Sequence, residues 1–284
     1  MQAHPEIRAG QSVELLKELH ILTRDGKLNQ DSRRKLKQVY HLYQFIEPLM
    51  QSVLDKQAAL GKSDGLRLVD HGAGKSYLGF ILYDLFFKRL NDASQVYGIE
   101  TREELVTRSQ ALAQRLGFAG MSFLNLSVAA STDSSLLPVE IDIVTALHAC
   151  NTATDDAIQF ALKKHASHIV LVPCCQAEVA SVLNSLKGKA LGKSALTEIW
   201  RHPLHTREFG SQLTNVLRCL QLEAHGYQVS VTELVGWEHS MKNELIIATY
   251  KNLPRRRAAE RLQEVLNSVG LEQMQQRFFT DEQV

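Results

Sequence analysis

The sequence predicts a doubly wound α/β fold, a seven-stranded Rossmann-like sheet that ends in an antiparallel hairpin. From Leu66 onward, short apolar runs alternate with helical segments, which is typical of βαβ units and a parallel sheet. A glycine turn follows the first apolar run, as in nucleoside-binding folds. The last two apolar runs, Tyr227–Val235 and Leu245–Tyr250, lie too close together for the crossover of about a dozen residues that parallel neighbours need. We therefore expect them to pair as an antiparallel hairpin.

A helical segment precedes the sheet. Apolar residues recur at helical spacing between Ser12 and Gln57, and a turn at Asp25–Lys27 separates two stretches. The hydrophilic segment 61–65 ends this pattern. We therefore expect an N-terminal helical extension over residues 1–60 and the main domain over residues 61–284.

The elements of the main domain follow in order. Strands are expected at Leu66–Asp70, Val96–Glu100, Met121–Leu126, Ile141–Leu147 and His168–Val172, with helices at Ser76–Leu90, Glu103–Leu116 and Thr154–Lys164 between them. A longer insertion follows the fifth strand. A helix over Phe209–His225 then leads into the hairpin, whose first strand runs parallel to the other five, and a helix over Arg255–Val269 comes last.

Composition restricts the possible surroundings of the chain. Its 284 residues include 32 basic and 31 acidic side chains, so the overall charge does not favour nucleic acid, a membrane surface or an acidic substrate. The sequence has no apolar run of about 18 residues and no secretion leader, so we expect a cytoplasmic chain that does not enter a membrane. The four cysteines are too few for a disulfide framework and lack zinc-site spacing, so reduced thiols and no metal are expected.

The segment Leu68–Gly79 predicts a nucleoside-binding turn. A strand ends at Asp70, and Gly72 and Gly74 then allow a tight turn whose backbone can approach a ligand before a helix begins. Glu100 closes the second strand, where a ribose-binding carboxylate belongs. The loop lacks the glycine spacing of dinucleotide sites and of phosphate-binding loops, which favours a nucleoside without phosphates. A purely structural turn is the alternative.

Two polar residues at the end of the third strand complete the predicted nucleoside site. Asn125 and Ser127 lie where the adenine edge would be read. Both residue types also form turns, so a structural role is an equal alternative.

Cysteines and acid–base residues follow the later strands. Ligands in open α/β sheets bind at the carboxyl ends of the strands, so one crevice is expected to receive His148, Cys150, Asp155, Cys174 and Cys175. His239 lies in the hairpin loop at the same edge. If the reacting atom carries a proton, His148, His239 or Asp155 would accept it. Buried cysteines, a core histidine and a helix start are the alternatives.

The segments His148–Asp156 and Pro173–Gln176 resemble a methyltransferase family that includes the glutathione S-transferase C-terminal-domain-containing protein and methyltransferase-like proteins. They are more distantly similar to eukaryotic tRNA 2′-O-methyltransferases. The resemblance implies a class I fold with S-adenosylmethionine as methyl donor, bound at Asp70, Gly72, Gly74 and Glu100. Asn151 and Gln176 stand where the tRNA enzymes have glycine and histidine, so no catalytic role of that histidine transfers.

A methyltransferase that acts on RNA is the function we expect. Phosphate contacts would come from Arg33, Arg34, Lys35 and Lys37 or from Arg255–Arg257, with Tyr40, Tyr43 and Phe45 available for stacking and the Trp200 insertion as a substrate-facing lid. Solvated helix faces with buried aromatics are the alternative. A protein or small-molecule acceptor, attack by Cys150 or Cys174 on a pyrimidine carbon, and a binding protein without transfer activity remain open. The sequence does not indicate an oligomeric state.

Overall fold

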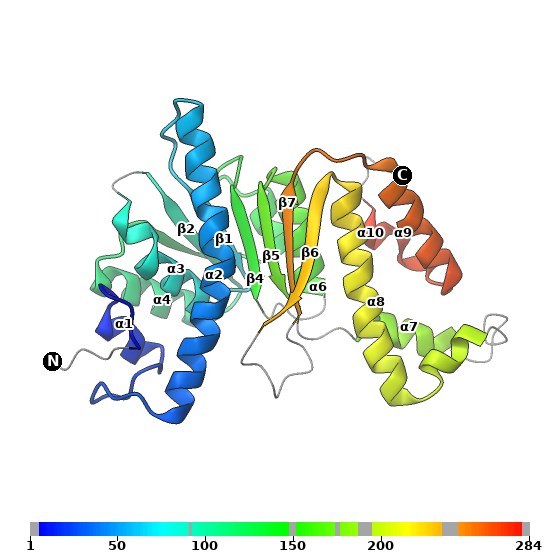
Figure 1. Cartoon of the computed structure of the whole chain (residues 1–284), viewed down its shortest axis with the longest axis horizontal. Coiled ribbons are helices and arrows are strands. Elements are labelled where there is room, and N and C mark those ends of the chain that lie inside the picture. Colours follow the sequence, from blue (N-terminus) through cyan, green and yellow to red (C-terminus); the bar gives the residue numbers. More distant parts are fainter. Residues whose placement is uncertain are drawn as a thin grey trace.

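The computed structural model describes residues 6–90, 93–147, 152–173, 177–186, 195–234 and 244–279. Its centre is a seven-stranded sheet in the order β3-β2-β1-β4-β5-β7-β6 (Figure 1). The strands are β1 (Arg67–His71), β2 (Gln95–Glu100), β3 (Met121–Asn125), β4 (Ile143–Leu147), β5 (His168–Val172), β6 (Tyr227–Glu233) and β7 (Glu244–Tyr250). The first five strands are parallel to one another, which confirms the predicted fold class.

The terminal hairpin has the predicted orientation and a position that was not predicted. β7 pairs antiparallel with both β5 and β6, so β6 points the same way as the parallel strands but lies at the sheet edge. Leu245, Ile246 and Ala248 of β7 are buried, whereas most of β6 after Tyr227 is exposed. Because β7 is the more apolar strand, its place is inside the sheet.

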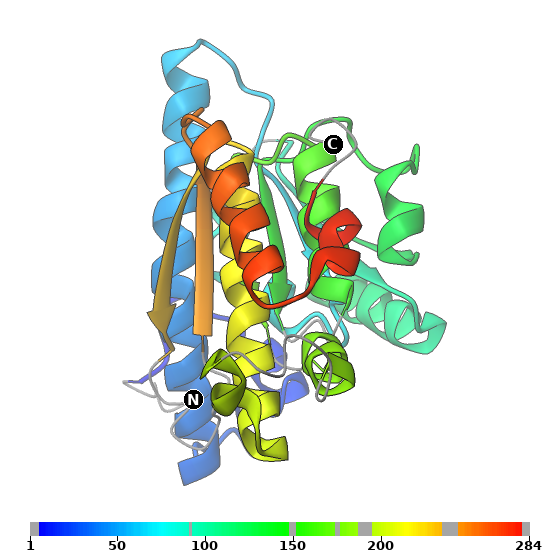
Figure 2. The same ribbon diagram turned by 90° about the vertical axis from the view of Figure 1, so that its right-hand side faces the viewer.

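Helices cover both faces of the sheet, and the strands divide their side chains between them. Leu68 and Val170 pack toward α1 (Val13–Glu18), α2 (Gln30–Ala59), α3 (Tyr77–Leu85) and α4 (Glu103–Leu116). Their strand neighbours Val69 and Ile169 pack instead toward the opposite layer. This layer is formed by α5 (Val128–Thr132), α6 (Thr152–Lys163) and α8 (Pro203–Ala224). This alternation is the period of two expected for a strand buried on both faces. Seen from the β6 side, α2 and α8 lie on opposite faces of the sheet (Figure 2).

The N-terminal helices pack into the same core as the sheet. Ser12 caps α1 by accepting a hydrogen bond from the Leu15 N–H, and Asn29 caps α2 in the same way with Ser32. One face of α2 is buried through Leu36, Tyr43, Ile46 and Met50. His168 of β5 bridges Ser52 of α2 and Thr249 of β7 at 3.1 and 3.0 Å, which fastens the C-terminal part of α2 to the sheet. The N-terminal helices therefore share their core with the strands.

A third core lies beside the hairpin. It is formed by α7 (Glu178–Leu186), α8, α9 (Arg256–Ser268) and α10 (Gln275–Phe278). Trp200 belongs to it, with 1% of its surface exposed and its ring stacked on Phe209 at 5.2 Å between centroids. Trp200 is thus a core residue. The prediction that it belongs to a substrate-facing lid is wrong for this side chain. Among the helices in the described ranges, none combines the length and the apolar character needed to cross a membrane.

Candidate active site

The turn after β1 has an unusual backbone. Gly72, Gly74 and Ser76 all have positive φ, at 62°, 57° and 51°, a conformation that glycine adopts freely and serine rarely. Two hydrogen bonds hold the turn against the end of β2: the Ala73 N–H donates to the Ile99 carbonyl at 3.0 Å and the Gly74 N–H to Glu100 at 2.8 Å. The turn therefore exposes backbone at a fixed place beside the carboxyl edge of the sheet.

Asp70 is the last buried carboxylate before this turn. It is 3% exposed, and it accepts hydrogen bonds from the Thr145 hydroxyl at 2.7 Å and from the Gly79 backbone N–H. Burial raises the pKa of Asp70 to about 7, although both hydrogen bonds act in the opposite direction. Asp70 also lines a pocket, so a ligand cation beside it would favour its ionised form.

Glu100 lies at the end of β2, where the ribose-binding residue was predicted. Burial alone raises the pKa of Glu100, but hydrogen bonds from Arg102 and from the Gly74 N–H outweigh it and hold the pKa at about 2. The Arg102 guanidinium contacts both carboxylate oxygens, at 2.9 and 3.1 Å. Glu100 is not among the residues that line the pocket described below, and its contact with a ribose stays a prediction.

Asn125 and Ser127 have structural hydrogen bonds. The Asn125 amide donates to the carbonyls of Glu100 and Thr101 at 3.2 and 2.9 Å, which ties the end of β3 to the end of β2. Ser127 caps α5 by accepting from the Ala130 N–H at 3.1 Å. An adenine contact by either residue stays a prediction.

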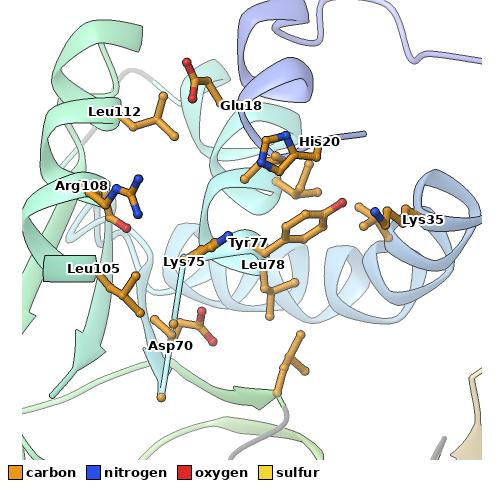
Figure 3. Close-up of a pocket in the computed structure, with 18 of the residues that line it drawn as sticks. Glu18, His20, Lys35, Asp70, Lys75, Tyr77, Leu78, Leu105, Arg108 and Leu112 are labelled. Atoms are coloured by element: carbon orange, nitrogen blue, oxygen red, sulfur yellow. The ribbon is translucent and has the colours of Figure 1, made fainter. Parts of the chain in front are cut away.

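A pocket of about 930 Å³ opens over the turn (Figure 3). Its floor is formed by Asp70 and the turn itself, and Leu147 marks the end of β4. The walls come from α1, α2, α3 and α4. Its volume lies near the top of the range of about 300–1,000 Å³ that is usual for ligand sites.

The charged side chains around this pocket are mostly basic. The acidic ones are Glu18 and Asp70, and the basic ones are His20, Lys35, Lys75, Arg102, Arg108 and Arg115. Most of these cations have a carboxylate beside them: Lys35 pairs with Asp31, and Arg102, Arg108 and Arg115 pair with glutamates.

Among the other predicted site residues, Asp155 lies in the described part of the chain. Asp155 lies at the start of α6, buried, with both of its oxygens bound by arginine. The Arg218 guanidinium donates to them at 2.6 and 3.0 Å, and Arg277 donates at 3.1 Å. This environment speaks against the predicted role of Asp155 as proton acceptor. The remaining candidates lie outside the described residues: His148, Cys150, Cys174, Cys175 and His239.

The aromatic residues of α2 are not free to stack on bases. Tyr43 is 1% exposed, and the guanidinium of Arg8 lies over the rings of both Tyr40 and Tyr43 at 4.9 and 4.7 Å. The Tyr40 hydroxyl accepts from the Arg8 N–H and donates to Gln11. Phe45 packs against the core. The aromatic side chains of α2 are therefore packed within the protein, as the alternative for these residues predicted.

Sequence reasoning missed the pocket walls. Lys35, Gln38, Val39 and Leu42 line it from α2, and this i, i+3, i+4, i+7 spacing is visible in the sequence. The spacing identifies a helix face but not what the face meets. Tyr77 and Lys75 stand within the glycine-turn segment, and the sequence reasoning assigned them no part in the site.

Comparison with known proteins agrees with this geometry. A family model described as a methyltransferase domain matches residues 34–182, more than half of the chain. Glutathione S-transferase C-terminal domain-containing proteins are similar: the Bos taurus protein is 28% identical over 200 residues, covering 64% of this chain and 30% of that protein. The Homo sapiens protein is 26% identical over 242 residues, covering 79% and 34%. The chain thus spans about a third of the length of these relatives.

Solved methyltransferase structures are more distant matches. Magnesium protoporphyrin IX methyltransferase from Synechocystis, with bound S-adenosylhomocysteine, has a TM-score of 0.41 at 17% identity and covers 84% of this chain and 93% of its own. An rRNA methylase from Streptococcus thermophilus has a TM-score of 0.40 at 12% identity, covering 68% and 89%. The family match and the sheet order agree with the resemblance found in the sequence. The chain belongs to the methyltransferase-domain family, with a class I fold and S-adenosylmethionine as its cofactor.

Proposed function

We propose that this chain transfers a methyl group from S-adenosylmethionine to RNA. The observation that carries the proposal is the pocket that joins the glycine turn and Asp70 to a wall of basic side chains. The family match supports methyl transfer. The lysine and arginine side chains at the pocket support a polyanionic acceptor, because phosphate contacts depend on these residue types. A cytoplasmic location stays a prediction from the sequence.

The residues of this chain fit the donor. S-adenosylmethionine supplies an activated methyl group when it is bound. Asp70 lines the pocket and can hold the donor's ammonium group, while Glu100 receives the ribose hydroxyls once Arg102 has turned away. The exposed backbone of the Gly72–Gly74 turn allows a close approach.

Transfer itself depends mainly on placement. Holding two reactants in a productive geometry contributes several kcal/mol to a group transfer, roughly 7–11 at best. His148 and His239 remain the predicted proton acceptors. Covalent attack by Cys150 or Cys174 remains the alternative, and it predicts a trapped adduct with a fluorinated pyrimidine RNA.

Labelled methyl transfer into fractionated cell extract tests the proposal. With radiolabelled S-adenosylmethionine, we expect the label in the RNA fraction. We expect no label with the Glu100→Ala variant, because its ribose contact is lost. Label confined to protein or to small molecules would overturn the RNA acceptor and leave the donor site intact. No transfer to any fraction, together with no donor binding by calorimetry, would overturn the methyltransferase proposal.

A further inference from the structure

The pocket extends beyond the donor turn. Asp70, the Gly72–Gly74 turn and Leu147 form the end that lies on the carboxyl edge of the sheet. The opposite end is enclosed by α1, α2 and the start of α3, where none of the predicted donor-binding residues lies. We call this end the α2 subsite and define it by His20, Lys35, Val39, Leu42, Lys75 and Tyr77.

The α2 subsite has apolar and cationic parts. Leu42 is 5% exposed and Val39 is half-buried, so they offer an apolar wall. Lys35 lies one turn before Val39 on the same face, and its ammonium contacts Asp31 at 2.9 Å with 42% of its side chain exposed. A cation at the rim and an apolar wall behind it suit a ligand that has an anionic group attached to a flat ring.

Tyr77 supplies an unused hydrogen-bonding group. It is the first residue of α3, and in Figure 3 its ring is drawn between His20 and Lys35. The Tyr77 hydroxyl is buried and has no hydrogen-bond partner in the ranges that the structure covers. Leaving a buried hydroxyl unpaired is costly, and a ligand atom at this place would remove that cost.

One cation of the subsite, Lys75, forms no ion pair within the described ranges. Lys35 is paired with Asp31, and Arg102, Arg108 and Arg115 at the donor end each pair with glutamate. Lys75 is exposed directly after the glycine turn, at the boundary between the donor end and the α2 subsite. An anion bound beside Lys75 would meet a cation that forms no ion pair in the described part of the chain, whereas an anion beside Lys35 would take the place of Asp31.

We propose that the α2 subsite binds one nucleotide of the acceptor RNA, taken out of its base stack. The base lies against Val39 and Leu42 and pairs with the Tyr77 hydroxyl, while its phosphate lies at the basic rim, where it contacts Lys75 and takes the place of Asp31 at Lys35. Enzymes that modify bases move the target nucleotide into a pocket in this way. This inference rests on the proposed function, and it names the residues that would bind the acceptor RNA.

Binding of single nucleotides tests the subsite without requiring activity. Each of the four ribonucleoside 5′-monophosphates, and inorganic phosphate, is titrated into the protein saturated with S-adenosylhomocysteine, with ligand-observed saturation-transfer NMR as readout. We expect at least one monophosphate to bind through its base protons. Lys35→Glu should weaken that affinity about tenfold or more through loss of a charged hydrogen bond, and Tyr77→Phe should weaken it less.

Lys56→Glu is the matched control. It makes the same charge change on α2 at an exposed position about 30 Å along the helix from Lys35, at 1.5 Å per residue. It should leave nucleotide affinity unchanged, and all variants should keep S-adenosylhomocysteine affinity.

The outcomes separate the two proposals. Binding of none of the four nucleotides, binding of inorganic phosphate alone, or equal affinities for Lys35→Glu and Lys56→Glu would overturn the α2 subsite. RNA labelling by the wild-type protein in the extract experiment would stand in each of these cases. Nucleotide binding with label only in protein would overturn the RNA acceptor instead.

Discussion

Two carboxylates at the same sheet edge have pKa values shifted in opposite directions, which follows from their different partners. Asp70 receives hydrogen bonds from the neutral Thr145 hydroxyl and a backbone N–H, so burial dominates and raises its pKa to about 7. Glu100 is also buried, but Arg102 and the Gly74 N–H hold its pKa at about 2. At neutral pH Glu100 is ionised, while Asp70 is partly protonated until a cation reaches it.

Donor affinity should therefore depend on Asp70 ionisation. The ammonium group of the donor favours the carboxylate form, so binding below about pH 7 must release the Asp70 proton. We expect S-adenosylhomocysteine affinity to rise between about pH 6 and 7.5, and calorimetry in buffers of different ionisation enthalpy to detect proton release at the low end. Asp70→Asn should bind more weakly and with little pH dependence over this range. A wild-type affinity that is constant over it would contradict this role.

At the scale of single elements, the sequence predicted the bounds of strands better than it predicted where helices begin or which strands pair. β2 and β5 have the predicted bounds, Val96–Glu100 and His168–Val172, to within one residue, because each is a short segment rich in apolar residues between polar ones. The helix α8 begins at Pro203 and not at Phe209, since proline fits the first turn of a helix and the polar residues after it continue that helix. The insertion of β7 between β5 and β6 depends on pairing partners far apart in the sequence, which local patterns do not encode.

The attachment of α2 to the sheet should weaken in acid. Burial, together with the nearby Lys251 and Lys56, lowers the pKa of His168 to about 4 from its ordinary value of 6.5. Between these two values the unfolded chain binds more protons than the folded chain, so stability falls as the pH falls from about 6.5 to 4. The difference between these two pKa values sets an upper limit of about 3 kcal/mol on this loss of stability.

His168→Gln separates this effect from other titrations. The variant keeps a side chain that can hydrogen-bond to Ser52 or Thr249 but cannot be protonated in this range. In urea denaturation between pH 4.5 and 7.5, the stability difference between wild type and variant should favour the wild type at pH 7.5 and shrink toward acid. Titration of Asp70 contributes equally to the stability of the wild type and of the variant, so it cancels in the difference. A difference independent of pH would show that His168 does not titrate as inferred.

At the scale of the whole molecule, the candidate site combines a donor turn that the sequence predicted with walls that it did not. The Asp70–Gly74 turn was predictable because its glycines and flanking strand are contiguous. The pocket walls were not, because α1 and α2 meet α4 only through tertiary packing. Arg218 and Arg277 were also missed, since each is one basic residue on an ordinary helix until α6, α8 and α10 bring them to Asp155.

The Asp155 cluster connects the sheet layer to the C-terminal helices. Arg218 is 1% exposed and Asp155 is 3% exposed, and Arg277 also contacts Glu178 of α7. Breaking a buried ion pair by removing one partner costs about 3–5 kcal/mol, because the other charge is left uncompensated. If Asp155 is structural, its loss should therefore lower stability much more than it alters donor binding.

Asp155→Asn and Arg218→Met decide between the structural and the catalytic role. We expect each to lower the unfolding free energy by about 3 kcal/mol or more in urea denaturation, and the double variant to be less unstable than the sum because neither charge then remains buried alone. Specific methyl transfer per folded molecule, measured well below the melting temperature, should change little in either single variant. If Asp155→Asn kept wild-type stability and S-adenosylhomocysteine affinity but lost transfer, Asp155 would act as the proton acceptor, and the structural assignment would be wrong.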